Sequence, residues 1–177
     1  MTPPQSLPMR RGRVSALHSI LPDRLDGGFT MPDAQCLCGA LKLMLREPSK
    51  LVVACHCLAC QRRTGSPFGV GAFYTIDTVE ISGGATEFVH VGDSGNRVRI
   101  YFCPTCGSTI YWKPDALPSM IGVAVGALAA PDFPAPALSI FERSKHHWVQ
   151  FDGEVEHFQE GAIRKYSPDL TRRSDSR

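Results

Sequence analysis

All seven cysteines of the chain fall in three short segments, and thiols grouped in this way are typical ligands of a metal ion. The segments are Cys36-Leu37-Cys38, Cys55-His56-Cys57-Leu58-Ala59-Cys60 and Cys103-Pro104-Thr105-Cys106. Thiolates that lie about 2.3 Å from one metal ion must lie close to one another, so short spacing favours chelation. Glycine follows two of the segments, at Gly39 and Gly107, and lets the backbone bend so that both sulfurs of a pair can face one ion. The pattern predicts zinc.

Seven thiols divide naturally into a set of four and a set of three. Four thiolates close the coordination of zinc and stabilise the fold, whereas three leave a position for water or substrate. Spacing alone does not decide which two segments share the closed site, and we favour the first and third, because they would join distant strands. This assigns the structural zinc to Cys36, Cys38, Cys103 and Cys106. It leaves the reactive, catalytic zinc to Cys55, Cys57 and Cys60, which share one short loop.

Other interpretations of the cysteines compete with two zinc ions. A redox-active C-x-x-C pair would need a βαβ context, which this strand-rich sequence lacks. Free cysteines are also common as small buried residues. An iron–sulfur cluster uses thiolate ligands too, but the middle segment has no fourth suitably placed cysteine. The chain could also hold one zinc with spare thiols, or a histidine could supply a ligand.

Histidine lies close to the cysteines in one segment and beside an aromatic residue in another. His56 stands between two predicted ligands, so its side chain should point away from the metal, where it either packs, orients a ligand or carries a proton. His146 and His147 precede Trp148. We interpret them as a polar loop packed against an aromatic side chain rather than as ligands.

The elements that must position these residues are predicted to be mostly strands. Short apolar runs separated by turn residues indicate an all-β domain of small sheets with few short helices and zinc-stapled loops. The expected strands cover residues 40–45, 51–54, 68–76, 79–81, 88–91, 98–102 and 109–112. Residues 92–96 should form a hairpin turn, and the prolines of residues 131–136 exclude regular structure before 138–141. The best helix candidates are the turn from Cys57 through Arg63 and the segment from Gln159 to Tyr166.

Composition excludes several classes of protein. The chain has 177 residues, 43% hydrophobic and 20% charged, which fits one folded domain and not a disordered chain. Its net charge of +2 is too small to indicate nucleic acid or an anionic membrane as a partner. The longest apolar run, from Met120 to Ala130, has 11 residues, fewer than the roughly 18–20 that a membrane span needs. We expect a cytoplasmic protein.

The two ends of the chain differ from its middle. Residues 1–30 are basic and contain early prolines, but Asp23 and Asp26 weaken an interpretation as an organelle-targeting presequence. We expect a disordered extension, or an upstream start codon with Met31 as the working start. The zinc domain should cover residues 31–166, and the polar residues 167–177 should form a frayed tail.

Three motifs in this order resemble the glutathione-dependent formaldehyde-activating family, which includes relatives of centromere protein V. The motifs are C-L-C-G from Cys36, C-H-C-L-A-C-Q-R-R-T-G-S-P-F from Cys55, and F-C-P-T-C-G-S-T-I-Y-W from Phe102. The resemblance extends roughly from Pro32 to Phe158 and includes the H-H-W segment at His146. One departure is Ala34, where the family often has glycine.

The resemblance implies a β-tent of small antiparallel sheets and the same division into a structural and a catalytic zinc. It implies a carbon–sulfur lyase-type reaction in which glutathione, as co-substrate, adds to formaldehyde or a related small electrophile and gives S-hydroxymethylglutathione. The partners would be this small-molecule thiol and the electrophile, without nucleic acid or membrane. The alternative is a non-catalytic zinc-binding interaction module.

Arg62 and Arg63 directly follow the reactive segment. Their guanidinium groups could offset the negative charge of a zinc ion with three thiolates and bind the carboxylates of the tripeptide. We predict them as substrate-binding residues, against the alternative of an ordinary solvated turn.

Overall fold

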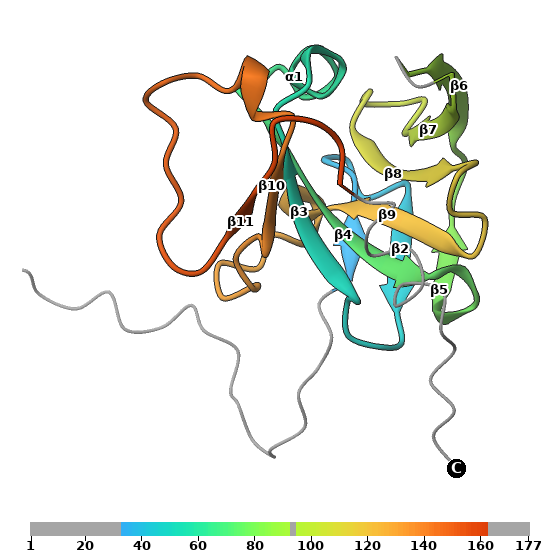
Figure 1. Cartoon of the computed structure of the whole chain (residues 1–177). Helices are drawn as coiled ribbons and strands as arrows, with labels where there is room; N and C mark the ends of the chain where they lie inside the picture. The colour runs from blue at the N-terminus through green and yellow to red at the C-terminus, as the bar shows by residue number, and fades with distance from the viewer. Residues whose placement is uncertain (1–32, 93–94, 163–177) are drawn as a thin grey trace, which may run out of the picture. The chain divides into compact units, whose positions relative to one another are not determined.

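The computed structural model describes residues 33–92 and 95–162, and these form two β-sheets (Figure 1). The small sheet has the order β1-β2-β5, with strands Ala34–Gln35, Lys42–Leu45 and Val79–Ser82. The large sheet has the order β11-β10-β3-β4-β9-β8-β7-β6. Its strands are Glu156–His157, Leu138–Ile140, Leu51–Cys55, Gly69–Thr75, Met120–Ala124, Thr109–Pro114, Arg97–Phe102 and Thr86–Val91. The prediction of a mostly β fold is confirmed.

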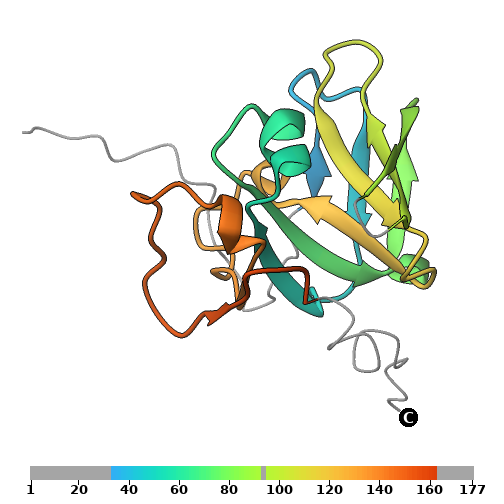
Figure 2. The same ribbon diagram turned by 45° about the horizontal axis from the view of Figure 1, so that its top comes forward.

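Helical structure is short in the described residues. One α-helix, α1 (Leu58–Thr64), lies at the end of β3, as Figures 1 and 2 show. Single 3-10 turns follow β4, β9 and β10, at η1 (Ile76–Thr78), η2 (Val125–Leu128) and η3 (Glu142–Ser144). Within residues 33–92 and 95–162, no helix is long and apolar enough to cross a membrane.

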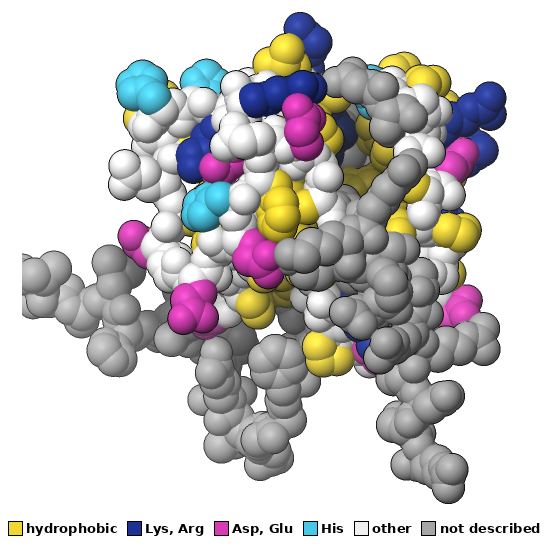
Figure 3. Space-filling model, viewed as in Figure 1, with side chains coloured by type: hydrophobic (Ala, Val, Ile, Leu, Met, Phe, Trp, Pro, Cys, Tyr) yellow, Lys and Arg dark blue, Asp and Glu magenta, His cyan; other side chains and the backbone are white. Residues whose placement is uncertain are grey.

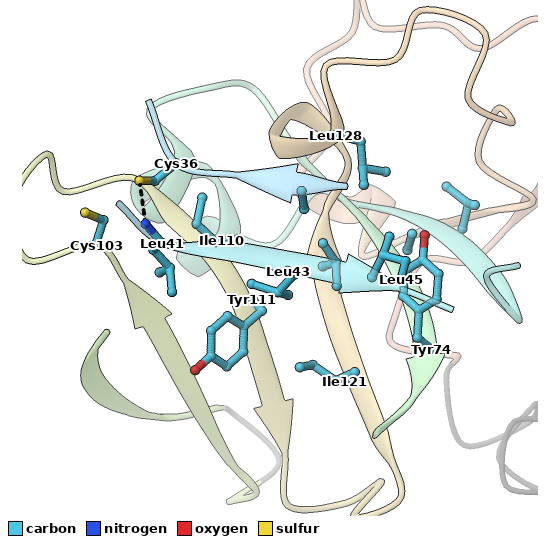
Figure 4. Close-up of a cluster of buried hydrophobic side chains, with 14 residues drawn as sticks. Cys36, Leu41, Leu43, Leu45, Tyr74, Cys103, Ile110, Tyr111, Ile121 and Leu128 are labelled. Carbon is cyan, nitrogen blue, oxygen red and sulfur yellow. Dashed lines mark hydrogen bonds between the residues drawn. The ribbon is translucent and has the colours of Figure 1, made fainter. Parts of the chain in front are cut away.

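The main core lies between the two sheets (Figure 4). In β2 the residues alternate between solvent and core, so that Leu43 and Leu45 are buried while Lys42 and Met44 are exposed. Strands β4, β8 and β9 of the large sheet supply the facing side chains, which are Ala72, Tyr74, Tyr111, Ile121 and Val123. This contact fixes the small sheet against the centre of the large one.

The opposite face of the large sheet carries a second core, formed by Val53, Phe73, Leu117, Met120, Leu138, Ile140 and Ala162. Trp112 packs at its edge over two glycines, because an ideal Cβ at Gly71 or Gly122 would lie only 2.4 Å from indole atoms. Because neither glycine has a side chain, the indole ring can lie close to the backbone at both positions, and we call this pair of residues the glycine bed of Trp112.

Strand β3 pairs with one antiparallel and one parallel neighbour. It pairs antiparallel with β4, which places Gly69 opposite Cys55, and parallel with β10, which places Ile140 opposite Cys55. Strand β10 also pairs parallel with β11. These parallel pairings bring residues 138–144 beside the end of β3, where α1 begins.

Most of the local predictions are confirmed. The seven expected strands correspond to β2 through β8, and the helix after Cys57 is α1. Residues 131–136 are irregular, and β6 and β7 form the expected hairpin, although residues 93–94 of its turn lie outside the described part. Strands β1, β9 and β11 were not predicted. The N-terminal extension of residues 1–30 and the tail of residues 167–177 lie outside the described residues.

The helix predicted from Gln159 to Tyr166 is wrong in its described part, since residues 159–162 are not helical. Phe158 donates its N–H to the carbonyl of Ser139, and the carbonyl of Glu160 accepts from the N–H of Phe141 at 3.3 Å. Gly161 lies so close to the Phe141 ring that an added Cβ would be 2.9 Å from Cζ. These tertiary contacts hold the segment, which bends at residues 159–160, beside β10 and outweigh its weak helix propensity. Residues 163–166 lie outside the described range.

Candidate metal centres

Four cysteines from two distant loops converge in the first cluster, and their Sγ atoms all lie within 4.8 Å of one another. They are Cys36, Cys38, Cys103 and Cys106. The Sγ atoms of Cys36 and Cys38 are 3.5 Å apart, and those of Cys38 and Cys103 are 3.7 Å apart. A zinc tetrahedron with bonds of about 2.3 Å has sulfur–sulfur edges of about 3.8 Å. The donor set therefore fits a four-thiolate zinc ion.

The local turns explain why these sulfurs face one another. Gly39 and Gly107 have φ values of 75° and 74°, in the left-handed region that favours glycine, and each closes a turn back onto a cysteine carbonyl. The backbone N–H of Leu41 points at Cys36 Sγ from 3.2 Å (Figure 4). A hydrogen bond from the side chain of Ser108 lowers the pKa of Cys106 to about 5, so thiolate formation is favoured there.

The second cluster consists of Cys55, Cys57 and Cys60, whose Sγ atoms also lie within 4.8 Å of one another. Cys55 ends β3, Cys57 is the N-cap of α1, and Cys60 lies in its first turn. The Sγ atoms of Cys55 and Cys57 are 3.4 Å apart, close to the edge of a zinc tetrahedron. The helix keeps this spacing, because Cys57 Sγ accepts from the N–H of Cys60 at 3.4 Å and Gly65 ends the helix with a φ of 64°.

The thiols of the three-cysteine cluster differ in their pKa. The thiols of Cys55 and Cys60 donate to Cys57 and lower its pKa to about 2. The same contact with Cys57 raises the pKa of Cys55 far above its ordinary value. Three thiols this close to one another disfavour ionisation of all three at once, and a divalent cation is the partner that would let all three ionise. All seven cysteines lie in the described part of the chain and are free thiols.

Of the two predicted arginines, the structure brings one to the cluster. Arg63 Nη2 lies 3.9 Å from Cys60 Sγ, and its guanidinium carbon lies 4.6 Å from the centre of the Trp112 ring. Arg62 is exposed. Figure 3 shows Lys and Arg side chains gathered over α1. The bed of Gly71 and Gly122 thus positions Trp112, and the indole positions Arg63 beside a sulfur.

His56 is fully buried and turned toward β10. Its ring contacts those of Phe68 and Phe151, with centroids 5.5 and 5.9 Å away, and Nε2 lies 3.1 Å from Ser139 Oγ. Because Ser139 donates its hydroxyl to Glu142 at 2.5 Å, the Nε2–H of His56 donates to Ser139. The Nδ1 atom has no partner among the described residues, and burial lowers the pKa of the ring. The interpretation of His56 as a packing histidine fits this environment.

Glu142 anchors this buried chain of hydrogen bonds. Lys145 Nζ lies 2.9 Å and His157 Nδ1 2.8 Å from its carboxylate. Partial burial raises the pKa of Glu142, but hydrogen bonds from Ser139, His157 and Lys145 outweigh it and lower the pKa to about 2. The carboxylate is therefore charged and tightly held behind the loop of the three-cysteine cluster.

Residues of η3 and of the loop after it contact α1 through Gln61. Gln61 Nε2 donates to the carbonyls of His56 and Ser144 at 2.8 and 2.9 Å, and its Oε1 lies 3.3 Å from His146 Nε2. The rings of His146 and Trp148 lie 5.6 Å apart. His146 and its neighbour His147 are exposed, and neither is part of the two cysteine groups found among the described residues.

A pocket of about 780 Å³ lies between the two clusters. Cys36 and Ser108 line one side, and Arg63, Thr64 and Ser66 line the other. The three-cysteine cluster lies directly behind its wall, because the lining residue Gly69 pairs with Cys55, and an added Cβ on this glycine would be 3.5 Å from Cys60 Cβ.

Several parts of the site come from distant elements and were not predicted from the sequence. These are the glycine bed of Trp112, the link from Ser139 to Glu142, and the carbonyl of Ser144 that receives Gln61. The pair Gly71 and Gly122, each inside an apolar run, was the available signal for close approach of a large side chain.

Comparison with protein families matches residues 31–144 to the family model described as glutathione-dependent formaldehyde-activating enzyme. The match covers more than half of the chain and includes every cysteine. No curated protein matches the chain. A crystal structure of a Rhodobacter sphaeroides protein is similar at 19% identity with a TM-score of 0.42, and the alignment covers 71% of this chain and 98% of that one.

Proposed function

Because the chain belongs to the glutathione-dependent formaldehyde-activating enzyme family, we propose that it is a zinc-dependent enzyme of the carbon–sulfur lyase type. It adds the thiol of glutathione to formaldehyde or a related small electrophile. The observation that carries this proposal is the three-sulfur cluster of Cys55, Cys57 and Cys60, which adjoins a pocket large enough for a tripeptide. Its volume of about 780 Å³ lies within the range of roughly 300–1,000 Å³ that small-molecule sites have.

The reaction itself is a simple addition. A carbon–sulfur bond forms, the π bond of the carbonyl breaks, and the thiol proton ends on the carbonyl oxygen, so that no redox partner is needed. Cys55, Cys57 and Cys60 would hold the zinc ion, which would supply Lewis-acid chemistry that either acidifies a thiol or polarises a carbonyl.

The residues of the chain supply charge and binding. The Arg63 guanidinium lies against Cys60 Sγ, where it offsets the negative charge of a three-thiolate centre, and it also lines the pocket. Thr64 and Ser66 lie beside it in the lining. A guanidinium next to hydroxyl groups suits the carboxylates and amides of glutathione. We therefore assign Arg63, and not the exposed Arg62, to substrate binding.

The proposal is tested by counting metal ions and by measuring catalysis. Native mass spectrometry should find two zinc ions on the wild-type chain and one on Cys57→Ser, whose circular dichroism spectrum should stay unchanged because the four-cysteine cluster is intact. Exchange NMR with ¹³C-formaldehyde should show that wild-type protein accelerates adduct formation above the spontaneous rate, and that Cys57→Ser does not.

Two results would contradict the proposal. One is a Cys57→Ser chain that keeps two zinc ions. The other is a wild-type chain that holds two zinc ions, binds no glutathione and does not change the rate, which would support a zinc-binding interaction module instead.

A further inference from the structure

We propose that the pocket between the two cysteine clusters selects an electrophile with a large apolar substituent, of the class of medium-chain or aromatic aldehydes. This inference rests on the proposed addition of glutathione and names the second substrate of that site. It is carried by the shape and chemistry of the pocket lining.

The lining of the pocket combines polar side chains with a set of apolar ones. The charge lies at the end of α1, where Arg63 is the single charged residue among the lining residues, all of which are described. Uncharged polar residues, Gln35, Ser108 and Thr109, also belong to the lining. The apolar part comes from the large sheet and from η2. It includes Phe68, Val70, Ile110, Val125 and Ala127.

The apolar part of the lining, called the apolar floor below, is held in place by packing against the protein core. Ile110 is 1% exposed, and Val70, Val125 and Ala127 pack against the main core from the pocket side. All four residues line the cavity, and Val70, Val125 and Ala127 are only half-buried. Leu37, which is 89% exposed, adds a further apolar side chain to the lining.

Glutathione and formaldehyde together do not match this lining. Glutathione carries charges and amides, which suit Arg63 and the hydroxyls beside it. Formaldehyde adds a hydroxymethyl group to sulfur, which is small and polar and leaves the apolar floor in contact with water. An alkyl or aryl group on the aldehyde carbon would cover this floor and would gain affinity for each methylene that it buries.

The chemistry of a larger aldehyde is the same as that of formaldehyde. The thiol sulfur bonds to the aldehyde carbon, the carbonyl π bond breaks, and the proton goes from sulfur to oxygen. The substituent stays bonded to the aldehyde carbon, and none of its own bonds forms or breaks.

Gly126 offers a way to fill the pocket without straining the fold. This residue lies in the lining, no atom lies within 4 Å of an added Cβ, and its φ is outside the left-handed region. Gly84 has the same open surroundings, also without a positive φ, but is not part of the lining. Gly126→Leu and Gly84→Leu are therefore a matched pair.

The test measures binding of S-methyl-, S-butyl- and S-hexylglutathione to the zinc-loaded protein by titration calorimetry. We expect the affinity of the wild-type chain to rise about two- to fourfold per methylene, so that S-hexylglutathione binds about 30-fold or more tighter than S-methylglutathione. Gly84→Leu should keep this increase, and Gly126→Leu should lose most of it. The wild-type series alone tests the inference if a variant does not fold.

A kinetic comparison separates this inference from the proposed function. With glutathione, wild-type kcat/KM should be higher for hexanal than for formaldehyde, and Gly126→Leu should lower it more for hexanal than for formaldehyde, whereas Gly84→Leu should preserve the wild-type ratio. An affinity that does not depend on chain length, together with turnover of formaldehyde, would overturn the inference and leave the function standing. An affinity that rises with chain length, without turnover of any aldehyde, would support the pocket assignment and overturn the function.

Discussion

Replacement of Arg63 by glutamine should weaken zinc binding at the three-cysteine cluster about tenfold, whereas Arg62→Gln should leave it unchanged. The two residues are neighbours on α1 and have the same charge, but Arg63 alone reaches a ligand, with Nη2 3.9 Å from Cys60 Sγ. A zinc ion with three thiolates is an anion, so a nearby guanidinium stabilises the loaded state over the empty one.

The magnitude follows from that distance. Two unit charges about 4 Å apart interact by about 4 kcal/mol at an effective dielectric constant near 20. Arg63 is only half buried, and its charge is spread over a guanidinium that water also reaches, so we discount this value to about 1–1.5 kcal/mol. That range corresponds to a change of about tenfold in affinity.

Chelator competition measures the effect directly. The Cys57→Ser chain supplies the contribution of the four-cysteine site, which is subtracted from each titration. Arg63→Lys should fall between wild type and Arg63→Gln, because it keeps the charge but loses the guanidinium group over Trp112, whose carbon lies 4.6 Å from the ring centre. Equal affinities for Arg62→Gln and Arg63→Gln would refute the reasoning.

Further predictions concern the support of the site. Gly71→Ala should lower the free energy of unfolding by about 1–3 kcal/mol and shift the tryptophan emission, because the new Cβ would lie 2.4 Å from Trp112; Gly84→Ala, with open surroundings, should do neither. Glu142→Gln should destabilise the chain at pH 7 in urea denaturation. Since the folded pKa of Glu142 is about 2 and its ordinary value is 4.5, this stabilisation is complete above about pH 4.5 and is lost as the pH falls through 2, so the difference from wild type should shrink on acidification. An unchanged difference at pH 3 would contradict the assignment. Removal of zinc by a chelator should lower the melting temperature of wild type more than that of Cys57→Ser, because the latter has one site fewer to lose.

The grouping of the cysteines could be predicted from the sequence because most members of each cluster are close together in the chain. A cysteine pair with one or two residues between its members, followed by glycine, determines its own turn, as the left-handed Gly39 and Gly107 show. The only long-range step was the pairing of the first and third segments, and the count of seven thiols limited the choices. The family resemblance is also confirmed. It could be found from the sequence for the same reason, because the motifs that carry it are short and local and can be identified before the fold is known.

The surroundings of the reactive cluster could not be predicted, because they depend on long-range pairing. Trp112 meets Gly71 and Gly122 only once β4, β8 and β9 are adjacent. Ser139 reaches His56 across 83 residues of sequence. Alternation and turn residues indicate where strands begin and end, but they carry no information on which strands pair or in which direction.

The parallel pairing of β10 with β3 explains why so much of the support comes from late in the chain. Strand β3 runs directly into Cys55, and the N–H of His56 donates to the carbonyl of Ile140 at 3.0 Å, so β10 fixes the backbone between two ligands. The side chain of His56 is held by Ser139 of the same strand. A shift of β10 would therefore move the sulfur of Cys55 relative to those of Cys57 and Cys60, which belong to the N-cap and first turn of α1. The spacing of three sulfurs in one short segment thus depends on a strand more than 80 residues away in sequence.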